Sequence, residues 1–279
     1  DKGRRGEHND RVGSENVQIS GGLIASNTVM NLIGQGIPLL VAVITIPLVV
    51  DGLGKERFGL LSLAWIFLGA FAIFDLGLGR ATTKFISEAL GKGDLVNIPP
   101  IFWSAVTVQA VFGVIGGIIL YWSSPFIIDN VLNIPAYLMA EANIVFNIIA
   151  LFIPILLITG SFSGVLEAAQ RFDYVNMVRM PSNISTYLLP LVGLFLGYGL
   201  PGIVALILIA KLACLAALII LNFRLLPGLR TYSISFSHFP RLFSFGGWIM
   251  ISNILGPIIY YLDRFVIGSL LTMTAITYY

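Results

Sequence analysis

The sequence predicts an all-α protein, a polytopic transmembrane helical bundle. Only 11% of its 279 residues are charged, whereas soluble domains carry roughly a quarter. The mean hydropathy is +0.92, and apolar stretches long enough to cross a membrane recur from residue 23 to the end. These stretches are long and nearly unbroken, so they do not match the short alternating strands of an outer-membrane barrel.

A membrane-crossing helix needs about 20 predominantly apolar residues. On this basis an eighth helix begins near Phe265, and the first seven cover residues 23–50, 58–79, 98–122, 142–166, 175–198, 202–222 and 242–262. The first residue is not Met, and the last residues, ITYY, stop within an apolar segment. We therefore interpret the chain as a fragment of a longer protein.

The predicted helices divide the chain into four regions. The polar tail 1–20 is expected to be disordered and cytoplasmic. Residues 21–222 form an N-terminal six-helix transmembrane lobe, and residues 223–241 form a cytoplasmic inter-lobe linker. Residues 242–279 begin a second lobe, with helix 7 and a truncated helix 8.

Basic residues near the helix ends predict the orientation, because cytoplasmic loops carry an excess of Lys and Arg. With the N-terminus inside, twelve of the sixteen lysines and arginines lie in inner segments, three lie in outer segments, and Lys211 lies within a helix. We therefore expect a multi-pass protein of the cell inner (plasma) membrane with a cytoplasmic N-terminus.

The stretch 80–94, after the second predicted helix, is expected to form a short interfacial helix. Lys84 and Glu88 are spaced i,i+4 and can pair on its surface. The apolar side chains expected to lie against lipid are Phe85, Ile86, Ala89 and Leu90.

Two predicted helices carry polar residues along one face. The first has Asn27, Asn31 and Gln35, and the fifth has Arg179, Asn183 and Thr186. Unpaired polar groups in hydrocarbon are costly, so both faces should point toward other helices or toward water. For the asparagines, interhelical hydrogen bonds are the simpler interpretation and ligand contact is the alternative.

Lys211 lies at the centre of the apolar run VALILIAKLACLAALIIL (204–221). A lysine at the bilayer centre costs about 3 kcal/mol or more, and such residues mostly face a cavity or a partner. No acidic residue lies in the middle of a predicted helix to neutralise it. We therefore expect a water-filled cavity or an anionic ligand beside Lys211, with contacts to backbone carbonyls as the alternative.

Sequence motifs of enzymes and metal sites are absent. Neither HExxH nor a P-loop is present, so the protein is expected not to be an enzyme and no catalytic residue is assigned. His8 and His238 are far apart, and Cys214 is the only cysteine. We therefore expect no metal site, no cofactor and no disulfide framework, and no nucleic-acid partner.

Two stretches carry a family resemblance. Residues 36–94 hold a proline-bearing helix, the turn LGKERFGLL and the exit FDLGLGRATTKF, and residues 243–279 hold FSFGGWIMISN and the turn DRFVIG before an eighth helix. Together they resemble polysaccharide biosynthesis proteins, the Wzx-type lipid-linked oligosaccharide flippases of the multidrug/oligosaccharidyl-lipid/polysaccharide exporter (MOP) superfamily. A faint repeat, between 49–61 and 266–279, agrees with two related halves.

This resemblance implies two six-helix lobes around a central cavity. It implies flipping of polyprenyl-pyrophosphate-linked oligosaccharide from the cytoplasmic to the outer leaflet by alternating access, with membrane lipids, a glycan polymerase and other polysaccharide-assembly proteins as partners. An anionic pyrophosphate headgroup needs a hydrated path with cationic contacts. The expected substrate-binding residues are Lys211 as a counter-charge, Arg80, Lys84 and Arg179 at the cytoplasmic mouth, and Asn31 and Gln35 for sugar hydroxyls. For Arg80 and Arg179, anchoring at the inner interface is an equally good interpretation.

Two other functions stay open at this point. A cation-coupled multidrug exporter would want a buried carboxylate, which the first predicted helix lacks, and Asp75 lies near the end of the second. In a non-transport membrane scaffold for glycan assembly, Lys211 would be structural only.

Overall fold

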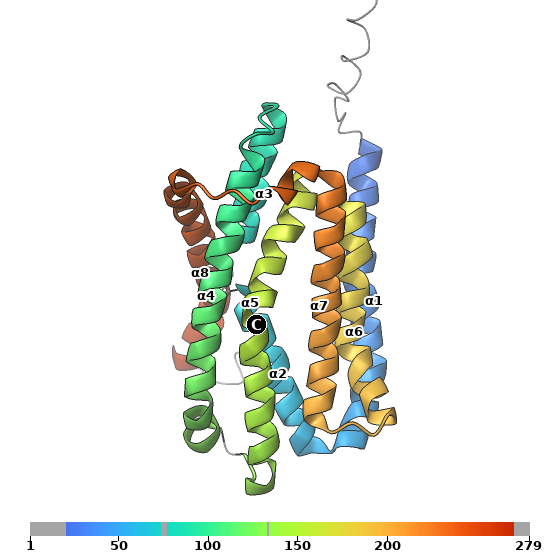
Figure 1. The fold of residues 1–279 in the computed structure, drawn as a ribbon. Coiled ribbons are helices and arrows are strands. Elements are labelled where there is room, and N and C mark those ends of the chain that lie inside the picture. Colours follow the sequence, from blue (N-terminus) through green and yellow to red (C-terminus); the bar gives the residue numbers. More distant parts are fainter. Residues whose placement is uncertain (1–20, 74–76, 133, 271–279) are drawn as a thin grey trace, which may run out of the picture.

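The computed structural model describes residues 21–73, 77–132 and 134–270. Within this part of the chain the fold is an elongated bundle of α-helices without strands, which confirms the predicted fold class (Figure 1). The α-helices are α1 (Gly21–Leu53), α2 (Lys55–Ile73), α3 (Leu78–Gly91), α4 (Ile98–Phe126), α5 (Met139–Ala168), α6 (Phe172–Phe195), α7 (Leu200–Leu225) and α8 (Phe239–Leu270). Asp75 and residues 1–20 lie outside the described residues.

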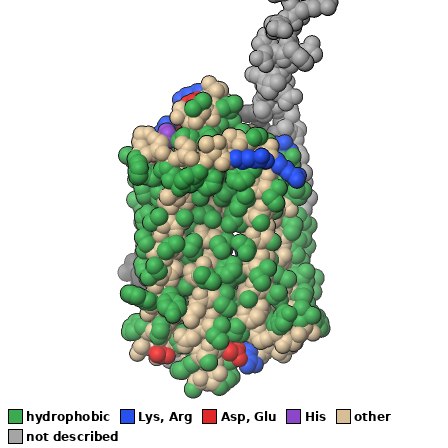
Figure 2. Space-filling model, viewed as in Figure 1, with side chains coloured by type: hydrophobic (Ala, Val, Ile, Leu, Met, Phe, Trp, Pro, Cys, Tyr) green, Lys and Arg blue, Asp and Glu red, His purple; other side chains and the backbone are tan. Residues whose placement is uncertain are grey.

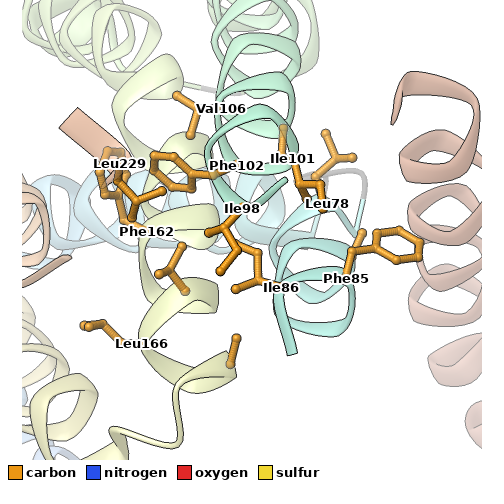
Figure 3. Close-up of a cluster of buried hydrophobic side chains, with 14 of the residues drawn as sticks. Leu78, Phe85, Ile86, Ile98, Ile101, Phe102, Val106, Phe162, Leu166 and Leu229 are labelled. Carbon is orange, nitrogen blue, oxygen red and sulfur yellow. The ribbon is translucent and has the colours of Figure 1, made fainter. Parts of the chain in front are cut away.

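Helix α5 is the centre of the bundle. It packs against α2, α3, α4, α6 and α7. Helices α1, α6 and α7 stand together on one side of α5, and α4 and α8 stand on the other (Figure 1). One buried apolar cluster joins α3, α4 and α5 through side chains such as Ile86, Phe102 and Phe162 (Figure 3). A second cluster, with Leu61, Phe146 and Ile203, joins α2, α5 and α7.

Helices α4 and α5 approach closely at two glycines spaced four residues apart. A Cβ atom on Gly113 would lie 2.4 Å from the Cα atom of Pro154, and one on Gly117 would lie 2.5 Å from the carbonyl oxygen of Ala150. Small residues at this spacing let the backbones of two membrane helices touch.

The molecular surface has the pattern of a membrane protein. Apolar side chains cover its middle, and charged side chains gather near its two ends (Figure 2). Among the described residues, four segments are long and apolar enough to cross a bilayer: Gly36–Leu53, Ile98–Val131, Ala136–Ala168 and Leu200–Leu225.

The predicted second span, 58–79, is not one continuous helix. Helix α2 ends at Ile73, residues 74–76 lie outside the described part, and α3 begins at Leu78. Gly77, directly before α3, has a φ of 64°, in the left-handed region that glycine tolerates best. A Cβ atom there would also lie 2.5 Å from the carbonyl oxygen of Gly246 on α8. Glycine at this position therefore permits both the change of direction and the contact with α8.

The predicted interfacial helix at 80–94 is wrong in its environment. Helix α3 exists, but Phe85, Ile86 and Ala89 are buried against the bundle instead of lying in lipid. The apolar face of α3 packs mainly on α5, with further contacts to α4 and α8. A periodic apolar face is compatible with either lipid or protein, so the pattern alone did not distinguish them.

The predicted Lys84–Glu88 pair is replaced by contacts with α8. Glu88 accepts a hydrogen bond from the guanidinium of Arg241 at 2.5 Å, and the Lys84 ammonium lies 4.0 Å from the ring centroid of Phe245. Both partners were too distant in sequence for a local pairing rule to find them.

The predicted turn before Phe265 is also absent, because α8 continues through it to Leu270. Residues 271–279 lie outside the described part. The division of the chain into two lobes stays a prediction. The predicted linker 223–241 begins in the last turn of α7 and ends in the first turn of α8. Between these helices the backbone forms two short 3₁₀ helices, Pro227–Arg230 and Phe236–His238.

Candidate functional site

A cavity of about 660 Å³ lies between α1, α2, α5, α6 and α7. Its floor and walls combine two cations with hydroxyl, amide, aromatic and aliphatic groups. The lining residues are Gly34, Pro38 and Leu39 from α1, Trp65, Leu68 and Gly69 from α2, Leu156 and Thr159 from α5, Arg179, Ser182, Asn183, Thr186 and Tyr187 from α6, and Lys211 and Cys214 from α7.

Lys211 lines this cavity from the middle of α7. At 1.5 Å per residue it lies roughly 16 Å from the start of the helix at Leu200 and roughly 21 Å from its end at Leu225. Its Nζ donates a hydrogen bond to the Ser182 hydroxyl on α6 at 3.2 Å. Within the described residues no salt bridge joins Lys211 to a carboxylate. The ammonium therefore faces a cavity with a neutral oxygen as its partner.

Arg179 is the second cation on the cavity wall, and it is already paired. Its Nη1 lies 2.8 Å from the Oε1 atom of Glu167 in an ion pair, with 45% of the arginine side chain and 24% of the glutamate side chain exposed. Glu167 also accepts a hydrogen bond from the Thr83 hydroxyl on α3 at 3.4 Å. The carboxylate is near the end of α5 and not in the middle of the span.

The polar face predicted for the fifth span does lie on the cavity, since Arg179, Asn183 and Thr186 all line it. The Thr186 hydroxyl donates to the Ser182 carbonyl at 3.1 Å, and the Thr159 hydroxyl donates to the Ile155 carbonyl at 2.7 Å. Because each hydroxyl hydrogen is used within its own helix, the lone pairs of the hydroxyl oxygens are left to accept from a ligand.

An aromatic wall closes one side of the cavity. The rings of Trp65 and Tyr187 meet edge to face with centroids 5.4 Å apart, and Phe58 meets Trp65 at 6.0 Å. Trp65 Nε1 is buried and has no hydrogen-bond partner among the described residues. An apolar wall beside a few placed polar groups is the usual build of a small-molecule site.

The structure brings together only part of the predicted binding set. Lys211 and Arg179 share the cavity, but Arg80 and Lys84 do not line it. These two face α8, where Arg80 donates to the Asn253 side chain at 3.5 Å and Lys84 lies over Phe245. The side chains of Asn31 and Gln35 lie outside the described residues, although the backbone of α1 is helical at both positions.

Sequence reasoning missed Glu167, Trp65, Tyr187 and Cys214 as parts of this site. Cys214 follows Lys211 by three residues, so helical spacing was the signal that could have placed both on one face. The other three come from different helices, and nothing in their local sequence reports the contact.

Comparison with known proteins agrees with this membrane architecture. The family model described as "Polysaccharide biosynthesis protein" matches residues 24–279. The chain is also 27% identical over 258 residues to a protein of Shigella flexneri named "Putative O-antigen transporter", an alignment that covers 92% of this chain and 60% of that relative. The chain thus spans about 60% of the length of the relative that it matches. No solved structure matches. The predicted family resemblance is confirmed: this multi-pass membrane protein belongs to the polysaccharide biosynthesis protein family.

Proposed function

We propose that this chain belongs to a membrane transporter that moves a lipid-linked, anionic polysaccharide precursor from the cytoplasmic to the outer leaflet. The observation that carries the proposal is the Lys211 ammonium on the wall of a cavity of about 660 Å³, bonded to the Ser182 hydroxyl. Membership of the polysaccharide biosynthesis family and the name of the Shigella flexneri relative support the class of cargo.

The charge of the cavity favours an anionic headgroup. It holds two cations, and only Arg179 has a carboxylate partner among the described residues. A phosphate-bearing headgroup would be stabilised beside Lys211 by charge-assisted hydrogen bonds. Hydroxyl acceptors and the Trp65–Tyr187 wall suit the polar edges and apolar faces of attached sugars.

In this proposal Arg80 and Lys84 serve as a separate cationic patch where α3 meets α8, near the inner end of the bundle. Asn31 and Gln35 on α1 remain candidates for contacts with sugar hydroxyls. The N-terminal end of the bundle faces the cytoplasm in this proposal, because most lysines and arginines lie in the predicted inner segments and only Lys55, Arg57 and Arg264 lie in the outer ones. A glycan polymerase and other assembly proteins are the proposed partners.

The test replaces Lys211 in the full chain and follows export in cells that depend on it. We expect Lys211→Ala to reduce surface glycan and to accumulate the lipid-linked precursor, with transport falling about tenfold or more, since a charged hydrogen bond is worth about 1.5–3 kcal/mol. Lys211→Arg keeps the positive charge and should retain more transport. Lys55→Ala is the matched control, because Lys55 is exposed at the other end of the bundle.

Normal surface glycan and normal precursor levels in an inserted Lys211→Ala protein would contradict a role of this cation in transport. That result would leave the scaffold function as the better interpretation. Altered resistance to cationic dyes without any change in glycan export would instead support a multidrug exporter.

A further inference from the structure

We infer that Glu167 is an internal counter-ion, which occupies Arg179 while the cavity is empty and gives it up to an anionic ligand. This inference rests on the proposed function, because it concerns the same cavity. It assigns Glu167 as a positioning residue that acts through Arg179 and sets the affinity for anions.

Arg179 is placed to exchange partners. It lines the cavity, and nearly half of its side chain is exposed, while its Nη1 lies 2.8 Å from the Oε1 atom of Glu167 in an ion pair. A guanidinium has five N–H donors in a fixed fork. The remaining donors can meet an anion in the cavity before the bond to Glu167 is released.

Glu167 has a second partner that remains after such an exchange. Its Oε2 lies 3.4 Å from the Thr83 hydroxyl on α3, whose one hydrogen is shared between this carboxylate and the Gly79 carbonyl at 3.1 Å. The carboxylate is 24% exposed, so water can take the place of the arginine. When Glu167 separates from Arg179, its charge is therefore not left buried without a partner. A buried, unpaired charge would make the exchange prohibitive.

Lys211 provides the contrast within the same cavity. Its bond goes to the neutral Ser182 oxygen, so its charge is available from the start. With Glu167 in place the two cations and one carboxylate sum to a net charge of +1. Neutralising Glu167 raises this to +2 and removes the group that competes with a ligand for Arg179.

The first experiment measures binding of inorganic pyrophosphate to the full chain purified in detergent, by titration calorimetry. We expect Glu167→Gln to bind pyrophosphate about two- to fivefold more tightly than wild type, the range that a partly exposed ion pair supports. Glu88→Gln is the matched control, because it removes the same charge from a carboxylate whose arginine partner, Arg241, does not line the cavity. It should leave the affinity unchanged.

Arg179→Gln separates a specific exchange from a general change of charge. In that background Glu167→Gln should no longer tighten binding, since the residue through which it acts is gone. Equal tightening with and without Arg179, or equal tightening by Glu88→Gln, would overturn the inference.

Cys214 provides a second measurement that needs no ligand. It lines the cavity three residues after Lys211 and is the only cysteine of the 279 residues. We expect Glu167→Gln to raise the rate at which a sulfonate-bearing methanethiosulfonate modifies this thiol, relative to an ammonium-bearing one, because the cavity becomes more positive. An unchanged ratio would count against the inference even where Glu167→Gln lowers stability.

The outcomes separate this inference from the proposed function. If pyrophosphate binding depends on Lys211 but does not change in Glu167→Gln, Glu167 is not a counter-ion and the anion site alone stands. No pyrophosphate binding by wild type overturns both.

Discussion

The guanidinium of Arg57, at the start of α2, donates two hydrogen bonds to the carboxylate of Glu141, at the start of α5. Nη2 donates to Oε1 at 2.7 Å and Nε donates to Oε2 at 3.0 Å. The side-chain hydrogen bond to Glu141, and then its charge, raise the pKa of Arg57. The two residues are 84 positions apart in the sequence. Their hydrogen bonds join α2 to α5 at the end of the bundle that lies opposite α3.

Breaking this pair should lower stability modestly. We expect Glu141→Gln to reduce the free energy of unfolding by up to about 1 kcal/mol, the upper end for exposed pairs, because the geometry is bidentate while 42% of the Arg57 side chain is exposed. Thermal unfolding in detergent measures the loss. Adding Arg57→Gln to Glu141→Gln should lower the free energy of unfolding little further. If the losses from the two substitutions added in full, Arg57 and Glu141 would not be coupled.

The contact between α4 and α5 should be intolerant of a single methyl group. Gly117→Ala places a Cβ atom 2.5 Å from the Ala150 carbonyl oxygen, and this backbone atom cannot move aside cheaply. We expect a loss of about 1–3 kcal/mol. Gly59→Ala is the control, because no described atom beyond its own turn of helix lies within 4 Å of its added Cβ and a helical alanine is favoured over glycine by roughly 1 kcal/mol. Equal melting temperatures for the two variants would show that the close approach is absent.

Phe102 should be among the most sensitive side chains of the bundle. It is fully buried, and its ring meets Phe162 edge to face at 4.9 Å (Figure 3). Phe102→Ala is expected to cost about 3–5 kcal/mol, because it leaves a cavity in the α3–α4–α5 cluster. Phe195→Ala, at a ring that is 81% exposed, should change stability by less than about 0.5 kcal/mol. Chemical denaturation of both variants in one detergent provides the comparison.

His238, in the connection between α7 and α8, should make stability depend on pH. Burial, and then the nearby charge of Arg241, lower its pKa below 6.5. The folded protein therefore binds fewer protons than the unfolded chain near this pH, so stability rises with pH there. The contribution is fully present above pH 6.5 and is lost as the pH falls through the lowered folded-state pKa.

Replacing this histidine should flatten the dependence. We expect His238→Asn to unfold at temperatures that vary less between about pH 5 and 7 than those of wild type. A variant with the same slope as wild type over this interval would exclude His238 as its source.

Much of the fold was predictable because the length of an apolar run can be read from the local sequence. The apolar runs around Ile101, Ile153 and Ile207 had to become helices, since only a helix satisfies the backbone of a single segment in hydrocarbon. The same reasoning placed Lys211 beside a cavity, because the cost of its charge can be read without knowing its neighbours. The same reasoning predicted the wrong environment for α3, because its apolar face is compatible with lipid and with protein.

The partners of each polar group were not predictable in this way. Glu167 meets Arg179 and Thr83, and Glu88 meets Arg241, only after helices from distant parts of the chain have packed together. Amino-acid sequence alone therefore determined the all-helical membrane architecture, the family and the presence of a costly cation in the predicted sixth span. Tertiary structure alone decided which charges are paired, because an ion pair depends on distances of a few ångströms between side chains that the local sequence does not relate.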